Sequence, residues 1–129
     1  MTRVTGIGGI FFQCEDPAAM NEWYGKHLGL PVTQWGASFG WRDEHDPEKK
    51  GMTQWSAMKK DTDYFSPSKK PFMINYRVEN LAELIETLKA EGVQVVGEIQ
   101  EFEYGKFGWI LDPEGNKIEL WEPPAEEKL

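Results

Sequence analysis

The sequence predicts an α+β domain made of two repeated βαβββ modules. Strand-like residues are followed twice by a capped amphipathic helix, first at Asp16 and again at Asn80, 64 positions later. The glycines that end these helices, Gly29 and Gly92, lie 63 positions apart. Near the end of the chain, a turn of Asp, Pro, Gly and Asn joins two apolar alternating runs, which is typical of a hairpin. Two copies of so long a period indicate a duplicated supersecondary unit and not a solenoid.

Module one is expected over about residues 4–60. The aromatic and β-branched run at 8–14 predicts a strand. Asp16 caps a helix over 15–29, Pro17 takes its first position and Gly29 ends it. Met20, Trp23, Tyr24 and Leu28 recur at helical spacing and form its apolar face. Three further strands are expected at 31–35, 38–42 and 52–58.

Residues 61–71, with two prolines and mixed charge, are expected to link the modules. Module two then covers about 72–122. Asn80 and Glu83 form a capping box for a helix over 80–91, whose apolar face carries Leu81, Leu84, Ile85 and Leu88. Its strands are expected at 72–78, 93–96, 103–111 and 117–121, and the tail at 123–129 is expected to be loose.

Composition restricts the class of partner. With 129 residues and 40% hydrophobic residues, we expect a single domain with its own core. The net charge of −8 argues against nucleic acid and against anionic lipid. No apolar run is long enough to span a bilayer, and the first residues lack the apolar core of a signal peptide, so a cytoplasmic protein is expected. Cys14 is the only cysteine, which excludes an internal disulfide.

The two modules, the hairpin that leads into Ile118-Glu119-Leu120, and Trp23-Tyr24 before Leu28-Gly29-Leu30 together resemble the vicinal oxygen chelate superfamily. That superfamily includes glyoxalase I, bleomycin resistance proteins and extradiol dioxygenases. The resemblance implies that the mixed sheet curls around a cavity, as in the glyoxalase-like fold. It also implies that each module supplies one metal ligand from its first strand and one from its fourth.

When the family's four ligand positions are placed on this chain, they fall on Gly9, Trp55, Met73 and Glu119. Glycine has no side chain, the Trp indole only donates, and the Met thioether is a poor ligand for hard divalent ions. His27, on the first helix, and His45, in a polar loop, lie near no other plausible ligand. We therefore expect no metal site of the family's kind and no other cofactor.

Strand parity selects the residues of the cavity, because positions two apart share a face of the sheet. Trp109 is taken as the repeat of Trp41, because Phe-Gly-Trp occurs at both places. A filled barrel closed by an Arg77–Glu119 ion pair, with the tryptophans as packing, is the alternative. The expected ligand-binding residues are Phe11, Gln13, Trp41, Trp55, Asn75, Arg77, Trp109 and Glu119.

The leading hypothesis is a small-molecule-binding protein without the usual divalent metal, which holds an aromatic or cationic organic ligand in this cavity. The alternative is a metal-independent lyase or isomerase in which Glu119 is the catalytic general base and Arg77 or Asn75 stabilises an oxyanion. A third hypothesis is a subunit whose exposed sheet edge serves assembly. A homodimer is expected, and the pairing of modules within one chain or between chains stays open.

Overall fold

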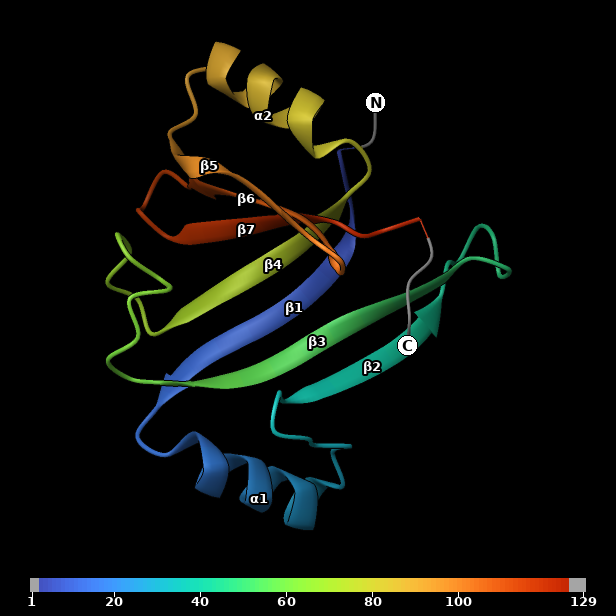
Figure 1. The fold of residues 1–129 in the computed structure, drawn as a ribbon, viewed down its shortest axis with the longest axis vertical. Coiled ribbons are helices and arrows are strands. Elements are labelled where there is room, and N and C mark those ends of the chain that lie inside the picture. The colour runs from blue at the N-terminus through green and yellow to red at the C-terminus, as the bar shows by residue number, and fades with distance from the viewer. Residues whose placement is uncertain (1–2, 126–129) are drawn as a thin grey trace.

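The computed structural model of this chain describes residues 3–125. Seven strands form one mixed sheet in the order β2-β3-β1-β4-β7-β6-β5, and two helices complete the α+β fold (Figure 1). The elements are β1 (Val4–Cys14), α1 (Pro17–Leu28), β2 (Ala37–Arg42), β3 (Lys50–Lys59), β4 (Phe72–Val78), α2 (Leu81–Ala90), β5 (Val95–Phe102), β6 (Gly105–Leu111) and β7 (Lys117–Glu122).

The two modules meet at the centre of the sheet, where the first strand of each, β1 and β4, pair in antiparallel fashion. Each first strand also pairs in parallel with the last strand of its own module, so β1 lies beside β3 and β4 beside β7. The duplicated arrangement expected from the 64-residue spacing is therefore present in the sheet. Figure 1 shows α1 beside the β2-β3-β1 half and α2 beside the β7-β6-β5 half.

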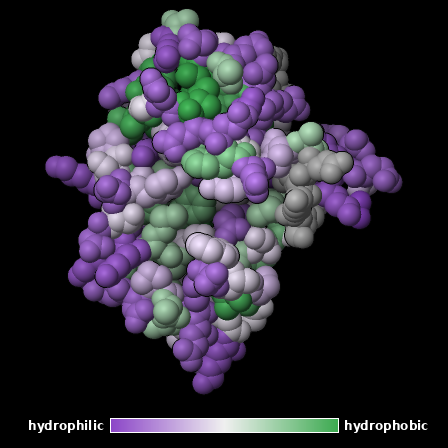
Figure 2. Space-filling model, viewed as in Figure 1, coloured by the Kyte–Doolittle hydropathy of each residue, from purple (hydrophilic) through white to green (hydrophobic). Residues whose placement is uncertain are grey.

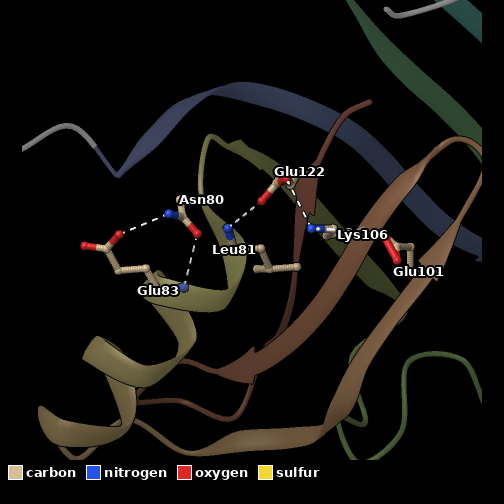
Figure 3. Close-up of polar contacts among 6 residues, drawn as sticks. All are labelled: Asn80, Leu81, Glu83, Glu101, Lys106 and Glu122. Atoms are coloured by element: carbon tan, nitrogen blue, oxygen red, sulfur yellow. Dashed lines mark hydrogen bonds and ion pairs between the residues drawn. The ribbon is translucent and has the colours of Figure 1, made fainter. Parts of the chain in front are cut away.

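Both expected helices are confirmed, with their caps. The Asp16 carboxylate accepts a hydrogen bond from the Ala19 amide at 3.1 Å, and Gly29 ends α1 in the left-handed region at φ 68°. At α2, the Asn80 side chain accepts from the Glu83 amide at 3.3 Å. The Glu122 carboxylate at the end of β7 accepts from the Leu81 amide at 2.8 Å, which ties the last strand to the start of α2 (Figure 3).

The two helices pack very differently. Leu81, Leu84 and Ile85 of α2 are buried against the sheet, as their spacing predicts. In contrast, α1 has no buried residue, and its Trp23 and Leu28 are exposed. The apolar face expected on α1 is therefore covered by the sheet only in part. Its main contacts with the sheet run through Tyr24, whose ring lies 4.8 Å from the Trp55 ring, centroid to centroid.

Three expected strands differ in the structure, and one of them, expected at 93–96, instead runs over Val95–Phe102. Residues 31–35 form no strand, and only an isolated bridge joins Thr33 and Gly36. The Trp35 carbonyl accepts from the side chains of Gln54 and Ser56, so its hydrogen bonds come from side chains and not from a neighbouring strand. The expected strand at 103–111 is shorter, because the chain turns before Gly105, which adopts a φ of 129°.

The remaining expectations concern the C-terminal tail and the absence of a membrane-spanning helix. Of the tail expected at 123–129, residues 126–129 lie outside the described part of the chain. Neither of the helices described between residues 3 and 125 is long and apolar enough to cross a membrane.

Candidate functional site

A cavity of about 690 Å³ lies between the two halves of the sheet. Eight of its fourteen described lining residues are aromatic. On the side of the molecule drawn in Figure 2, most side chains are hydrophilic, and hydrophobic side chains gather beside α2 and across the middle of the sheet. The lining residues are Gly8, Phe11, Trp35, Met52, Gln54, Met58, Tyr64, Asn75, Phe102, Tyr104, Phe107, Trp109, Glu119 and Trp121.

Glu119 lies in the cavity wall with only 2% of its surface exposed. The sheet register sets Asn75 of β4 on one side of it and Trp109 of β6 on the other. Asn75 Nδ2 donates to Glu119 Oε1 at 2.6 Å, and Trp109 Nε1 donates to Glu119 Oε2 at 2.9 Å. A buried carboxylate is costly without hydrogen-bond donors, so these two neighbouring strands make the position of Glu119 tolerable.

A third donor comes from the segment that joins the modules. The Tyr64 hydroxyl donates a hydrogen bond to Glu119 Oε2. The neighbouring Phe65 is 1% exposed and packs with Phe11, Met73 and Trp109 in the core beneath the cavity. The segment expected only to link the modules therefore supplies a site residue. The sole sequence signal was the aromatic pair Tyr64-Phe65 within an otherwise polar stretch.

The charge of Glu119 acts on two neighbouring groups. Burial, together with the nearby carboxylate, raises the pKa of the Tyr64 hydroxyl. Burial lowers the pKa of Lys117, and Glu119 opposes that shift. Lys117 Nζ donates to the Tyr64 carbonyl at 2.7 Å and lies 5.5 Å from the centroids of the Tyr64 and Trp109 rings. Lys117 therefore fixes the backbone of Tyr64 and supplies a positive charge near the cavity.

Of the eight residues expected in the pocket, Phe11, Asn75, Trp109 and Glu119 line the cavity. Trp55 was expected there and instead lies on the face that carries α1, with its ring 5.4 Å from that of Phe12 and close to Tyr24. Gln13 is half-buried on β1 outside the lining.

The register explains the error at Trp55. Phe11 lies opposite Ser56, and Asn75, 64 positions after Phe11, lies opposite Glu119. The structural partner of Glu119 is therefore Ser56, at a spacing of 63, and not Trp55 at 64. A shift of one residue along a strand moves every side chain to the other face. Met52, Gln54 and Met58 line the cavity in place of Trp55.

Trp41 and Arg77 line a separate hollow of about 730 Å³. The Arg77 guanidinium lies 4.9 Å from the Trp41 ring centroid and 5.0 Å from that of Trp121, and it donates to the Met52 carbonyl. Trp41 is not the repeat of Trp109, because Trp41 lies opposite Gly51 whereas Trp109 lies opposite Glu119. The hydrogen bonds that hold Glu119 come from Tyr64, Asn75 and Trp109, in place of the ion pair with Arg77.

The residues at the family's ligand positions do not fit a divalent metal. When Ser56 replaces Trp55 as the repeat partner of Glu119, these positions are Gly9, Ser56, Met73 and Glu119. Met73 is fully buried in the core. The described residues contain no group of three His, Cys, Asp or Glu side chains that could hold an ion. Both oxygens of Glu119 already accept hydrogen bonds from protein donors. The side chains at these four positions therefore supply fewer than the three protein ligands that a divalent metal site normally needs.

Comparison with known protein families identifies the domain type of this chain. A sequence profile described as a glyoxalase-like domain matches residues 9–121, which is most of the chain. The chain belongs to the glyoxalase-like domain family. A search of curated proteins gave no match to this glyoxalase-like domain.

Solved structures share the fold at low sequence identity. Methylmalonyl-CoA epimerase from Mycobacterium tuberculosis is 21% identical, with a TM-score of 0.64 over 97% of this chain and 92% of that one. A variant of the Streptomyces coelicolor epimerase in complex with 2-nitronate-propionyl-CoA is 18% identical, with a TM-score of 0.71 over 98% and 99%. NAD-dependent benzaldehyde dehydrogenase from Legionella pneumophila is 11% identical, with a TM-score of 0.59 over 90% and 98%. At these identities the similarity establishes the fold alone.

Proposed function

We propose that this glyoxalase-like domain binds a small organic ligand in its aromatic cavity, without the divalent metal site of the wider superfamily. The observation that carries the proposal is the buried carboxylate of Glu119 in the cavity wall, held by donors from three different segments. A core closed for stability alone would use apolar side chains, because a buried charge carries a desolvation penalty of several kcal/mol. A charged group retained among aromatic walls is typical of a ligand pocket.

The test is a screen of aromatic, cationic and carbonyl compounds by thermal shift and by tryptophan fluorescence. Fluorescence is informative here because Trp109 and Trp121 both line the cavity. We expect hits whose stabilisation is lost in Glu119→Gln and retained in Glu114→Gln, a matched change at an exposed carboxylate in the β6–β7 turn. Hits that stabilise the wild type and Glu119→Gln equally would contradict a binding role for Glu119.

A second candidate function is a metal-independent lyase or isomerase with Glu119 as general base. The hydrogen bond between Tyr64 and Glu119 favours it, because a phenol and a carboxylate in contact can pass a proton between them. The test is to incubate the ligands found in the screen in D₂O and to follow deuterium at their acidic C–H positions. Incorporation in the wild type and none in Glu119→Gln would support turnover, and no incorporation would leave binding as the function.

The neighbours' CoA ester is not the ligand class that we favour for this chain. A CoA ester carries phosphates, whereas the one charged residue among the described lining residues is the acidic Glu119. The exposed aliphatic side chains Val4, Ile7 and Ile10 of β1 support the further proposal that the protein is a homodimer. Light scattering at several concentrations tests the dimer, and a monomer at all of them would refute it.

A further inference from the structure

We propose that Tyr64 occupies, in the ligand-free protein, the position on Glu119 that a cationic N–H donor of the ligand takes on binding. This inference rests on the proposed function of the cavity and names its ligand class: a flat aromatic compound with an amidinium or ammonium group. Tyr64 is then a displaceable donor that keeps Glu119 hydrogen-bonded until the ligand arrives.

The charge pattern of the cavity sets the ligand class. Among the described lining residues, Glu119 is the only acidic or basic side chain. The ammonium group of Lys117 lies outside this lining, 5.5 Å from the Tyr64 and Trp109 rings, and donates to the Tyr64 carbonyl. The walls around it are mainly aromatic faces, which attract cations through their quadrupoles. Phe102 and Tyr104 at the β5–β6 turn are stacked, 5.2 Å apart and within 5° of parallel, and Trp35 lines the other half of the cavity. A flat cation therefore meets stacking surfaces and a counter-charge in one place.

The three donors to Glu119 are not equally fixed. Asn75 is 2% exposed and Trp109 is 7% exposed, and each lies in a strand directly opposite Glu119. Tyr64 is 37% exposed and lies in the connection between β3 and β4, where no strand or helix holds it. Loss of the Asn75 or Trp109 hydrogen bond would leave a buried donor unpaired, whereas a displaced Tyr64 hydroxyl can reach water. Tyr64 is therefore the donor that a ligand can replace.

The exchange is favourable for Glu119. A hydrogen bond from a charged N–H to a carboxylate is roughly twice as strong as one between neutral groups, and an amidinium offers two parallel N–H donors. The Tyr64 backbone need not move, because Lys117 Nζ holds its carbonyl and the neighbouring Phe65 is anchored in the core. Rotation of the Tyr64 side chain is enough to vacate Oε2 of Glu119. Glu119 Oε2 then accepts from Trp109, which keeps its hydrogen bond, and from the ligand.

The experiment measures the affinity of benzamidinium, of neutral benzamide and of anionic benzoate for the wild type and two matched variants. Tyr64→Phe removes the competing hydroxyl and keeps the ring. Tyr24→Phe removes a hydroxyl from α1, on the other face of the sheet and outside the described cavity lining. We expect Tyr64→Phe to bind benzamidinium about tenfold more tightly, which corresponds to the net worth of one hydrogen bond to a charged group. Tyr24→Phe should bind benzamidinium within about twofold of the wild type, and benzoate should bind to none of the three proteins.

The outcomes separate the two proposals. If the wild type binds none of the three probes and no other compound of the screen, the proposed function fails together with this inference. If benzamidinium binds in a way that depends on Glu119 while Tyr64→Phe binds it equally or more weakly, only the displacement is refuted. Tighter binding of benzamide or benzoate than of benzamidinium refutes the cationic ligand class.

A second measurement follows Tyr64 in the wild-type sequence and needs Tyr64→Phe only to assign its resonance among those of the four tyrosines. With 3-fluorotyrosine incorporated, the ¹⁹F resonance of Tyr64 should move toward its value in unfolded protein when benzamidinium saturates the site. Benzoate at the same concentration should leave it unchanged. A Tyr64 resonance that does not move under saturating benzamidinium would overturn the displacement.

Discussion

Replacement of Glu119 by Gln changes the charge of the site with almost no change in shape. The Gln carbonyl oxygen can accept from Tyr64 and Trp109, as Oε2 of Glu119 does. Its amide then faces the Asn75 amide, and two donors would clash. Asn75 Oδ1 is buried without a hydrogen-bond partner among the described residues, so rotation of the Asn75 amide gives the Gln donor an acceptor.

The expected effect on folding is therefore small. Three charge-assisted hydrogen bonds become neutral ones, at a loss of about 1 kcal/mol each. Removal of a buried charge returns a desolvation penalty of similar total size. We expect the unfolding free energy of Glu119→Gln to lie within about 1 kcal/mol of the wild type, a Tm change of less than about 5 °C for a chain of this size. Glu119→Leu should cost about 2–6 kcal/mol, because the Asn75 and Trp109 donors are left buried and unpaired.

Urea denaturation gives both free energies, and the ligand-induced thermal shift of Glu119→Gln gives the functional effect in the same protein. We expect a fold close to wild type in stability and a ligand response that is lost. If Glu119→Gln is destabilised as strongly as Glu119→Leu and still responds to ligand, Glu119 serves the fold and not the site.

Three further results are expected. Protein purified without chelator should hold no stoichiometric Zn, Mn, Fe or Ni, and such a metal, if present and lost in Glu119→Gln, would contradict the ligand mapping. Gly8→Ala should lower the unfolding free energy by about 1–3 kcal/mol, because the new methyl would lie 2.1 Å from Asn75 Oδ1, and unchanged stability in urea would contradict this packing. Folding raises the pKa of Tyr64 above its ordinary value of 10.0, so the unfolded state releases this proton first and stability is lost as pH rises above 10. Tyr64→Phe should lose less stability than the wild type between about pH 10 and pH 11, and equal losses would refute this linkage.

The fold was predictable because local signals and the repeat agree. The caps at Asp16 and Asn80 and the apolar spacing of α2 are properties of neighbouring residues, and the structure confirms them. Residues 31–35 do not form the expected strand, because the Trp35 carbonyl accepts hydrogen bonds from the side chains of Gln54 and Ser56 of β3. No pattern within that segment indicates such a long-range hydrogen bond.

The site was predictable only where it lies in regular strands. Period-two alternation placed Asn75 and Glu119 on one face, and the register bears this out. Trp109 was assigned to the same face through a repeat with Trp41 that the register does not support, so its position was right for a wrong reason. Trp55 was assigned to the wrong face of the sheet, because the repeat spacing is 63 and not 64 between β3 and β7. A shift of one residue moves each side chain of β3 to the opposite face. Tyr64 was missed because it meets Glu119 across 55 positions of sequence from a segment with no periodicity.

The connection between the modules also breaks the symmetry of the duplicated chain. A protein built from two like units begins with two equivalent half-sites, here at Ser56 and Glu119, one for each module. Only one connection joins β3 to β4, and its Tyr64 reaches Glu119 and not Ser56. The described lining residues are thus left with one acidic side chain, Glu119, and an asymmetric cationic ligand bound as we propose would be held in one orientation. Divergence of the two copies after duplication has in this way turned a twofold arrangement into a directional one.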